Sequence, residues 1–345
     1  MPMQALFTTG KPDAPLTWRE TPTPDIDQAT DAIVRPLAVA ACDLDKSIVS
    51  GRSPFAAPFM LGHEFTGVVL KAGEGVSRIA AGDLVLASFQ PSCGTCPRCE
   101  TAMTSVCESV PNGTMYGIGP TGGDWGGALA EAIRVPWADN NLAPLPRGMD
   151  YAPIASASDN LADGLRCVDK PLSSRPDSSV LIAGRGSIPL YATVCAQFLG
   201  AGEITVASDD PFVLQTAHAL GVECLEVGRW PKRFASHEIT VDCTNDVDGL
   251  AAVLRSTAPY GTCTSASIFF GGDIPVPVFN MNMRGITFHT GRVNSAGAIP
   301  RVLALLENGL DPERINPAYH AFDDAIDALI TEPFSRKVIV RRGIT

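Results

Sequence analysis

Apolar residues follow two different periods in the two halves of this chain. Residues 1–155 carry short β-like runs separated by glycine, proline and aspartate, with few helical periods. From Ser178 the pattern changes, because residues 179–183, with the apolar run 180–183, are typical of a buried strand. Apolar positions then recur at helical spacing through 191–199. A strand followed directly by a helix indicates the start of a βαβ unit.

Strand and helix patterns alternate over the next seventy or so positions. Strand-like runs at 204–207, 224–227, 239–243 and 262–266 are interspersed with helical patterns near 212–220 and 250–257. This alternation predicts a parallel sheet with helices on its faces. A further helix is expected near 299–306, and the strand-like run 337–340 could return to the first domain. The predicted fold class is α/β, with an irregular β domain ahead of a doubly wound parallel sheet.

Length and composition narrow the class of ligand. At 345 residues the chain exceeds what one hydrophobic core usually supports, so two domains are expected. The residues are 45% hydrophobic and 18% charged, as in ordinary globular proteins. A formal net charge of -11 argues against nucleic acid and membrane surfaces as partners, because phosphate binding requires clustered Lys and Arg. Small molecules are the expected ligands.

The sequence predicts a cytoplasmic protein. The first 25 residues mix charged side chains with short apolar pieces, unlike a signal peptide, and the apolar run 180–183 is far shorter than a membrane span. The chain contains ten cysteines. Under reducing conditions, clustered cysteines more often bind metal than form disulfides.

Four cysteines have the spacing C-x2-C-x2-C-x7-C: Cys93, Cys96, Cys99 and Cys107. Four thiolates can complete a tetrahedral zinc shell and leave no position for a substrate, so such a site is structural. The alternative, four unrelated loop cysteines, is disfavoured because exposed thiols at this density are reactive. We expect zinc here to organise a lobe with little apolar core of its own.

A second set of candidate ligands is Cys42, His63 and Asp159. Three protein ligands and one vacant position make a catalytic zinc site. Each residue also has a simpler interpretation when taken alone: Cys42 as a small buried residue, His63 as a core histidine and Asp159 as a helix N-cap. Spacing by itself leaves these alternatives open.

Several motifs occur together in one order. They are Cys42 with Asp45, the run Gly62-His63-Glu64-Phe65-Thr66-Gly67, the run Ala81-Gly82-Asp83-Leu84-Val85, the four cysteines, the run Gly126-Gly127-Ala128-Leu129-Ala130-Glu131, and the glycine-containing strand-to-helix turn after residue 183. With these motifs the chain resembles the zinc-containing medium-chain dehydrogenase/reductase family, within the alcohol dehydrogenase superfamily, over nearly its full length. The joint match is specific for the family but says little about the substrate.

The resemblance implies both domains and roles. It implies a GroES-like catalytic domain over 1–155 with a structural zinc lobe near 90–110, a Rossmann domain over 156–292, and a segment 293–345 that returns to the catalytic domain. Homodimers and homotetramers are both usual in the family. The implied ligands of a catalytic zinc are Cys42, His63 and Asp159, with Glu64 as a neighbouring carboxylate able to approach the metal. Asp45 is implied to accept a hydrogen bond from the imidazole and so to fix it.

A nucleotide loop is expected after the first predicted strand of the second domain. Gly184 and Gly186 fit the first two positions of G-x-G-x-x-G, which permit a tight turn and close approach of a pyrophosphate to a helix N-terminus. Ser187 and Ile188 follow, and Pro189 takes the third glycine's place, where a first-turn proline is tolerated.

The cofactor is expected to be NAD rather than NADP. Ser208 stands where the resemblance places the ribose-binding acid, and Asp209 and Asp210 follow it with no Lys or Arg adjacent in the sequence. These carboxylates would repel a 2'-phosphate. Lys337 stands where family members often have a basic residue that helps to bind cofactor phosphate; a solvent-exposed surface lysine is the alternative.

The resemblance implies hydride transfer between an alcohol or polyol and its aldehyde or ketone, with two zinc ions per chain. The chain departs from the family at Leu44, where many members have the hydroxyl that starts a proton relay, and at Ser47, often a histidine. A leucine cannot pass a proton, which favours as an alternative the reduction of an imine or activated alkene. A non-catalytic zinc- and nucleotide-binding protein is an alternative of another class.

The remaining candidates carry simpler expectations. Phe89 and Trp125 are expected on loops near the zinc, where they either shape an apolar pocket or pack only. The other cysteines are expected to be small buried residues: Cys167, Cys195, Cys224, Cys243 and Cys263. No chemistry is assigned to the histidines without ligand spacing, which are His218, His237, His289 and His320.

Overall fold

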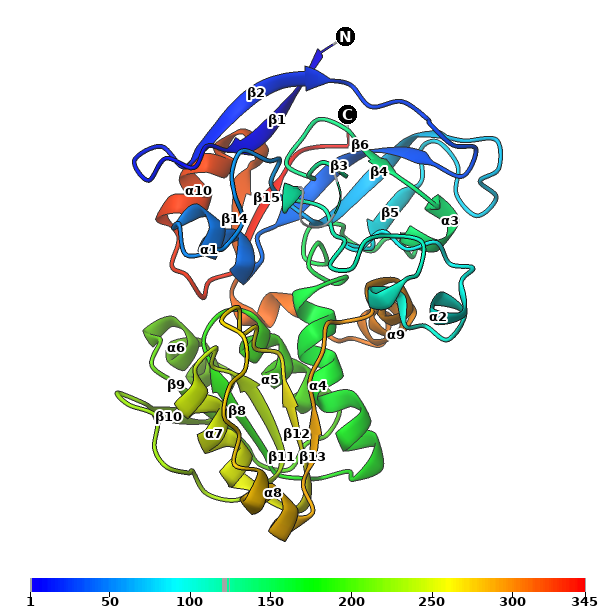
Figure 1. The fold of residues 1–345 in the computed structure, drawn as a ribbon. Coiled ribbons are helices and arrows are strands. Elements are labelled where there is room, and N and C mark those ends of the chain that lie inside the picture. Colours follow the sequence, from blue (N-terminus) through cyan, green and yellow to red (C-terminus); the bar gives the residue numbers. More distant parts are fainter. Residues whose placement is uncertain (1, 120–122, 124, 345) are drawn as a thin grey trace.

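The computed structural model describes residues 2–119, 123 and 125–344. Two lobes are visible in Figure 1, one built around a mixed sheet and the other around a parallel sheet. Helix α4 (Asn160–Ser174) leads from the first lobe into the second. Among the described residues, no helix combines the length and the apolarity that crossing a bilayer requires.

The first lobe holds a two-stranded antiparallel sheet and a seven-stranded sheet. The seven-stranded sheet has the order β14-β15-β3-β4-β5-β7, with β6 also paired to β3. Nearly every residue of β3 is buried, because the neighbouring strands and loops cover both of its faces. The strands are β1 (Pro2–Thr8), β2 (Leu16–Pro22), β3 (Ala32–Ala40), β4 (Glu64–Ala72), β5 (Leu84–Ala87), β6 (Ile133–Val135), β7 (Leu142–Pro144), β14 (Ala318–Ala321) and β15 (Val338–Arg341).

Short helices connect these strands and position the site. Helix α1 (Asp43–Val49) begins after Cys42, and the Asp45 carboxylate accepts a hydrogen bond from the Cys42 backbone N–H at 3.0 Å. This capping box fixes the chain direction at the end of β3. The others in this lobe are α2 (Pro97–Glu100), the 3-10 turn η1 (Thr104–Val106), α3 (Ala138–Asn141), the turn η4 (Phe322–Asp324) and α10 (Ala325–Thr331).

The second lobe is a six-stranded parallel sheet of order β10-β9-β8-β11-β12-β13. The strand order reverses between β8 and β11, which is the point where ligands bind in open α/β sheets. The strands are β8 (Val180–Gly184), β9 (Ile204–Ser208), β10 (Glu223–Glu226), β11 (His237–Cys243), β12 (Thr257–Ser265) and β13 (Thr287–His289). The predicted α/β fold class is confirmed, with helices α5 (Ile188–Phe198), α6 (Pro211–Ala219) and α7 (Val247–Ser256) between the strands.

Some of these elements were not predicted from the sequence patterns. Helix α4 buries Leu161, Leu165, Val168 and Leu172, which recur at helical spacing, so a usable signal was present. Pro171 near its end obscured the pattern. Strand β12 begins five residues earlier than predicted, because Thr257 already pairs with His237 ahead of a register irregularity. Helix α8 (Val278–Arg284) was also missed.

The C-terminal segment crosses back to the first lobe. Helix α9 (Ser295–Glu307) and the 3-10 turn η3 (Pro312–Ile315) lead to β14, α10 and β15. These last elements, orange to red in Figure 1, lie against the blue strands of the first lobe. Strand β15 pairs with β3 in antiparallel register, with Ile339 opposite Ala40. The predicted return of the run 337–340 to the first domain is confirmed.

Candidate active site and metal centres

Four buried side chains converge between the two lobes. Cys42, His63, Glu64 and Asp159 each place one sulfur, nitrogen or oxygen atom within 4.8 Å of the others. Cys42 precedes α1, His63 and Glu64 lie at the start of β4, and Asp159 precedes α4. Three elements distant in the sequence thus bring a metal-binding set together, and the donor set of thiol, imidazole and carboxylate suits zinc.

His63 lies between two carboxylates. Its Nδ1 atom is 3.4 Å from Asp45 Oδ1, and its Nε2 atom is 3.2 Å from Asp159 Oδ2. Burial by itself lowers the pKa of His63, but Asp45 and Asp159 outweigh burial and hold that pKa well above its usual range. The same arrangement directs Nε2 toward the other candidate ligands and leaves Nδ1 to Asp45, as in metal sites where a carboxylate orients the ligating imidazole.

Asp159 occupies the position before α4 but makes no side-chain capping hydrogen bond. Its carboxylate faces His63 instead, which rules out the simple N-cap interpretation. Burial raises the pKa of Asp159, yet the hydrogen bond with His63 and that residue's charge bring the net pKa below its ordinary value. An ionised carboxylate at this point is suited to a cation.

Asn160 contacts several functional groups at once and was not singled out from the sequence. Its Nδ2 donates to Cys42 Sγ at 3.3 Å, and its Oδ1 accepts from Ser187 Oγ at 2.9 Å and from Lys337 Nζ at 2.6 Å. The side chain is buried. A donor to sulfur favours the thiolate form, although burial raises the pKa of the Cys42 thiol.

The surface alternative for Lys337 is wrong. Lys337 is 1% exposed, and its Nζ lies 2.7 Å from Glu64 Oε2. Burial lowers the pKa of Lys337, but the Glu64 charge more than compensates and keeps the lysine cationic. A buried lysine requires such a partner. Lys337 holds Glu64 beside the candidate ligands.

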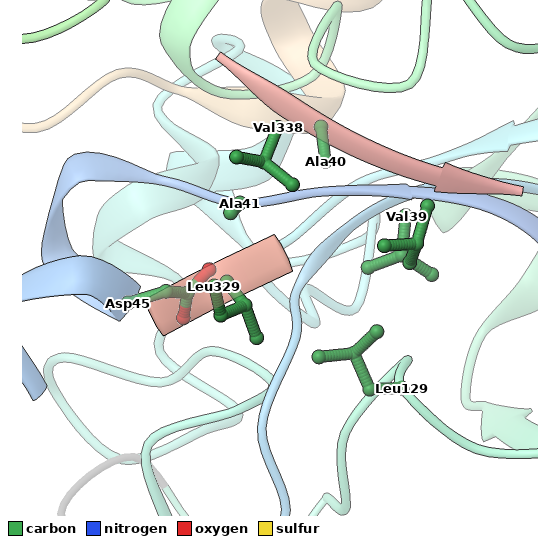
Figure 2. Close-up of a pocket in the computed structure, with 8 residues that line it drawn as sticks. Val39, Ala40, Ala41, Asp45, Leu129, Leu329 and Val338 are labelled. Atoms are coloured by element: carbon green, nitrogen blue, oxygen red, sulfur yellow. The ribbon is translucent and has the colours of Figure 1, made fainter. Parts of the chain in front are cut away.

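A small cavity lies behind Asp45. Figure 2 shows its lining residues, of which Asp45 is the one ionisable side chain among apolar neighbours from β3, α10 and β15. The cavity measures about 10 Å³ and offers a water molecule too few polar partners. Asp45 is therefore screened from solvent and directs its oxygens to Cys42 N–H and His63.

The four closely spaced cysteines, here called the cysteine ladder, form a separate cluster in the first lobe. Cys93, Cys96, Cys99 and Cys107 place their sulfurs within 4.8 Å of one another around α2 and η1. Backbone N–H groups donate to the sulfurs, for example from Cys96 to Cys93 Sγ at 3.3 Å and from Cys93 to Cys107 Sγ at 3.3 Å. Against burial, such hydrogen bonds lower the pKa of Cys93 to about 6. The cluster fits a closed four-thiolate zinc shell.

The strand-to-helix turn after β8 has the geometry that a nucleotide loop needs. Gly184 has a φ of 141°, and a Cβ atom there would lie 2.1 Å from the Cys243 carbonyl oxygen, so only glycine fits. Helix α5 begins at Ile188 with Pro189 in its first turn. Ser187 N–H points out of the helix N-terminus, where it meets the carboxylate of Asp43.

Strand β9 ends with Ser208 and is followed by Asp209 and Asp210. Asp209 forms an ion pair with Arg185 of the glycine loop, which the sequence analysis overlooked because it counted only adjacent residues. Asp210 caps α6 through Phe212 N–H at 2.9 Å and also accepts from Ser335 Oγ at 2.6 Å. No Lys or Arg is adjacent to these acids in the sequence, but the fold brings Arg185 to Asp209.

A cleft of about 520 Å³ runs between the lobes. Leu44 and Ser47 of α1 line one side, and Thr244 and Asp246 after β11 line the other. The remaining lining residues are Cys42, Asp43, Arg52, Arg185, Ile188, Asp210, Cys243, Asn245, Ala266, Ile268, Phe270 and Phe334. The candidate metal ligand Cys42 thus shares one cleft with the candidate nucleotide loop.

The two aromatic candidates differ in position. The Phe89 ring lies 5.7 Å from the His63 ring, centroid to centroid, and is buried beside the candidate ligands. The Trp125 ring packs 6.3 Å from Trp137. Most of the other cysteines are buried as expected, whereas Cys224 is only half-buried.

Comparison with known proteins identifies the family to which this architecture belongs. Residues 28–147 match the model of the alcohol dehydrogenase GroES-like domain. The structure superimposes on an alcohol dehydrogenase from Thermus sp. ATN1 with a TM-score of 0.90 at 28% identity, covering 99% of this chain and 100% of that one. The chain belongs to the zinc-containing medium-chain dehydrogenase/reductase family. It is an oxidoreductase of the alcohol dehydrogenase superfamily.

Two curated relatives give the same assignment for this zinc-type dehydrogenase. A probable zinc-binding alcohol dehydrogenase of Mycobacterium tuberculosis is 28% identical over 316 residues, covering 90% of this chain and 80% of that protein. A glutathione-independent formaldehyde dehydrogenase of Pseudomonas aeruginosa is 32% identical over 283 residues, covering 77% of this chain and 66% of that protein. At these identities the family is established but the substrate is not.

Proposed function

We propose that this dehydrogenase interconverts an alcohol or polyol and its aldehyde or ketone by hydride transfer with NAD(H). One observation carries the proposal: Asn160 hydrogen-bonds both Cys42 Sγ and Ser187 Oγ, at 3.3 Å and 2.9 Å. The candidate metal ligands and the candidate nucleotide loop are therefore joined through one side chain. A substrate oxygen held at the metal ligands would lie close to a cofactor held at the loop, which hydride transfer requires.

Each candidate residue has a distinct task in this proposal. Cys42, His63 and Asp159 would hold a zinc ion, which supplies a Lewis acid that polarises the substrate oxygen. Asp45 orients the His63 ring, and Glu64 is kept by Lys337 from closing the remaining position. Together with the four cysteines of the ladder, this gives two zinc ions per chain.

The proton route differs from a hydroxyl relay. Leu44 lines the cleft two residues after Cys42 and has no group that can donate or accept a proton. Ser47 Oγ donates to the Asp43 carbonyl oxygen at 3.0 Å and so stays tied to its own helix. Either water in the cleft or Glu64 is left to carry the proton. The same observation favours a second candidate function, the reduction of an imine or activated alkene.

NAD is proposed as the cofactor because a carboxylate directly follows Ser208, the last residue of β9, which stands where the resemblance places the ribose-binding acid. Asp209 is that carboxylate, and its ion pair with Arg185 is the feature that could instead accommodate a 2'-phosphate. The ratio of kcat/KM for NAD and NADP decides between them, and a tenfold preference for NADP would overturn the choice of NAD.

Metal analysis tests the catalytic proposal. The purified chain should contain two zinc ions, and Asp159→Ala should lose one of them together with alcohol oxidation. Cys99→Ser should lose the other zinc. A wild-type chain that binds zinc only at the cysteine ladder would favour a non-catalytic zinc- and nucleotide-binding protein. A screen of alcohols, polyols, aldehydes, imines and activated alkenes, followed by cofactor absorbance, would then separate the two enzymatic candidates.

A second copy of this chain is the proposed partner. Helix α8 exposes Val278, Phe279 and Met283, each more than 60% accessible, beside the terminal strand β13 of the parallel sheet. Exposed apolar side chains next to a free sheet edge suit association with a matching surface. Phe279→Glu should convert a dimer or tetramer to a smaller species in light scattering, and an unchanged mass would exclude this surface.

We also propose a cytoplasmic location. The ten cysteines are all free thiols, and those of the two candidate zinc sites must remain reduced to bind metal.

A further inference from the structure

A carboxylate from the first lobe occupies the mouth of the nucleotide loop. Asp43 Oδ1 and Oδ2 accept from Ser187 N–H at 3.1 Å and 3.0 Å, and Oδ1 also accepts from Ser187 Oγ at 3.3 Å. A Cβ atom built on Gly186 would lie 2.1 Å from Asp43 Oδ2. The absent side chain of Gly186 therefore leaves a space that the Asp43 carboxylate fills.

The neighbouring backbone N–H group of the loop also has a hydrogen-bond partner. Gly186 N–H donates to Ser335 Oγ at 2.8 Å, and Ser335 Oγ donates in turn to Asp210 Oδ2. Both N–H groups belong to the loop and helix N-terminus that would face a pyrophosphate. Both are satisfied here by side chains from other parts of the chain.

The arrangement has a direct electrostatic consequence. The N-terminus of α5 favours an anion, and Asp43 supplies one from within the protein. A dinucleotide pyrophosphate also needs to accept hydrogen bonds there, so it cannot share the N–H group of Ser187 with the Asp43 carboxylate at 3 Å. Burial raises the pKa of Asp43, while Lys337, Ser187 N–H and Lys46 act in the opposite direction and favour its charged form. Asp43 must move away before the pyrophosphate can bind there, and its charge continues to oppose the ligand at short range.

We propose that Asp43 sets the affinity of this enzyme for its cofactor. In the cofactor-free protein it substitutes for the pyrophosphate on the glycine loop and links α1 to α5 across the cleft, and the cofactor binds by displacing it. This inference rests on the proposed nicotinamide cofactor site, and it adds a competing internal anion to that site.

The variant Asp43→Asn tests the effect of the negative charge of Asp43 separately from its hydrogen bond. Asparagine keeps an oxygen that can accept from Ser187 N–H but removes the negative charge. Binding of NADH, ADP and adenosine to wild type and variant is measured by calorimetry or fluorescence. We expect the dissociation constants for NADH and ADP to fall at least tenfold in the variant. Adenosine, which carries no phosphate, should change less than twofold. The gain should shrink as salt is raised, because screening weakens the repulsion in the wild type.

Asp248→Asn is the matched control. Asp248 is exposed in the first turn of α7 and does not line the cleft. This variant makes the same change in net charge away from the loop, so its NADH and ADP affinities should change less than twofold. The melting temperatures of both variants verify that they fold.

The outcomes are distinguishable. Equal ADP and NADH affinities in wild type and Asp43→Asn would overturn the role of Asp43 while leaving the proposed function intact. Equal gains in Asp43→Asn and Asp248→Asn would also overturn it, because a general charge effect would then be sufficient. If NADH and NADPH bind to neither wild type nor variant, both this inference and the proposed function fail. The ADP measurement requires no bound zinc, so a change in metal content does not obscure it.

Discussion

Lys337 Nζ lies 2.7 Å from Glu64 Oε2, and neither side chain is accessible to solvent. Removing one partner of a buried ion pair leaves an uncompensated charge and costs about 3–5 kcal/mol. Lys337→Met should therefore lower the free energy of unfolding by about that amount, measured by urea denaturation. Lys337→Met combined with Glu64→Gln should recover part of the loss, because no isolated charge remains.

A surface or phosphate-binding role for Lys337 predicts the opposite pattern. In that case Lys337→Met would leave the unfolding free energy unchanged and would weaken NADH binding only. The double variant would then show no recovery relative to the single one.

Asp45 should control metal affinity through His63. Its Oδ1 lies 3.4 Å from His63 Nδ1, so Asp45→Asn weakens the contact that orients the ring. Loss of such outer-shell partners typically costs about 10–100-fold in metal affinity. Competition with a chromophoric chelator should show this weakening for one zinc per chain, with the zinc of the cysteine ladder unaffected as the internal reference. Equal retention of both ions in Asp45→Asn would contradict this role.

Leu44 should limit proton release during alcohol oxidation near pH 7. Leu44→Ser introduces a hydroxyl two residues after Cys42, and positioned acid–base groups commonly contribute rate factors of about 100 or more. We expect kcat for oxidation at pH 7 to rise by roughly tenfold, a modest share of that range. Leu44→Ala opens similar space without a hydroxyl and serves as the control. If both variants show the same pH profile of kcat as the wild type, proton exit is not limiting.

Lys46 should give stability a measurable pH dependence. It is 5% exposed, and its Nζ donates to the carbonyl oxygens of Pro333 and Arg336 at 2.5 Å and 2.6 Å. Burial lowers its pKa from 10.5 to about 8. Between these two values the unfolded chain binds the proton more strongly than the folded one, so the stability contribution of Lys46 increases as pH rises from 8 to 10.5.

The comparison is with Lys46→Met, which fills the same site without a titratable group. The difference in unfolding free energy, wild type minus variant, should grow between pH 8 and 10.5 by at most about 1.4 kcal/mol per pH unit. Below pH 8 the difference should be constant. Asp43 and Lys337 are charged neighbours of Lys46 and are present in both proteins, so they largely cancel. Parallel curves over the whole range would show that the Lys46 pKa is not depressed.

Local sequence patterns predicted most strands of the parallel sheet but not every helix. Strands β8 and β9 are buried throughout because both faces are covered, and β8 is a continuous apolar run that can be recognised from the sequence alone. Helix α4 carries buried leucines at regular spacing, yet its polar outer face and Pro171 concealed it. Helix α8 has no buried residue, so no core-facing stripe marked it.

Only those parts of the site that belong to short local motifs could be recognised in the sequence. Cys42, His63 and the cysteine ladder stand in short recognisable runs, and the structure brings each set together. The contacts Asp43 to Ser187 and Lys337 to Glu64 join residues 144 and 273 positions apart. No periodicity or spacing encodes such pairs, because they depend on how the two lobes and the returning C-terminal segment are placed.

The position of β15 in the first sheet bears on how the protein is made. Strand β15 pairs with β3, but the whole parallel sheet is translated between them. The N-terminal-first order in which domains usually fold during synthesis therefore cannot complete this sheet on a nascent chain. Lys337, which neutralises Glu64, emerges from the ribosome in the same late stretch. The candidate metal site of this dehydrogenase thus acquires the counter-charge of Glu64 only after the whole parallel sheet has been translated.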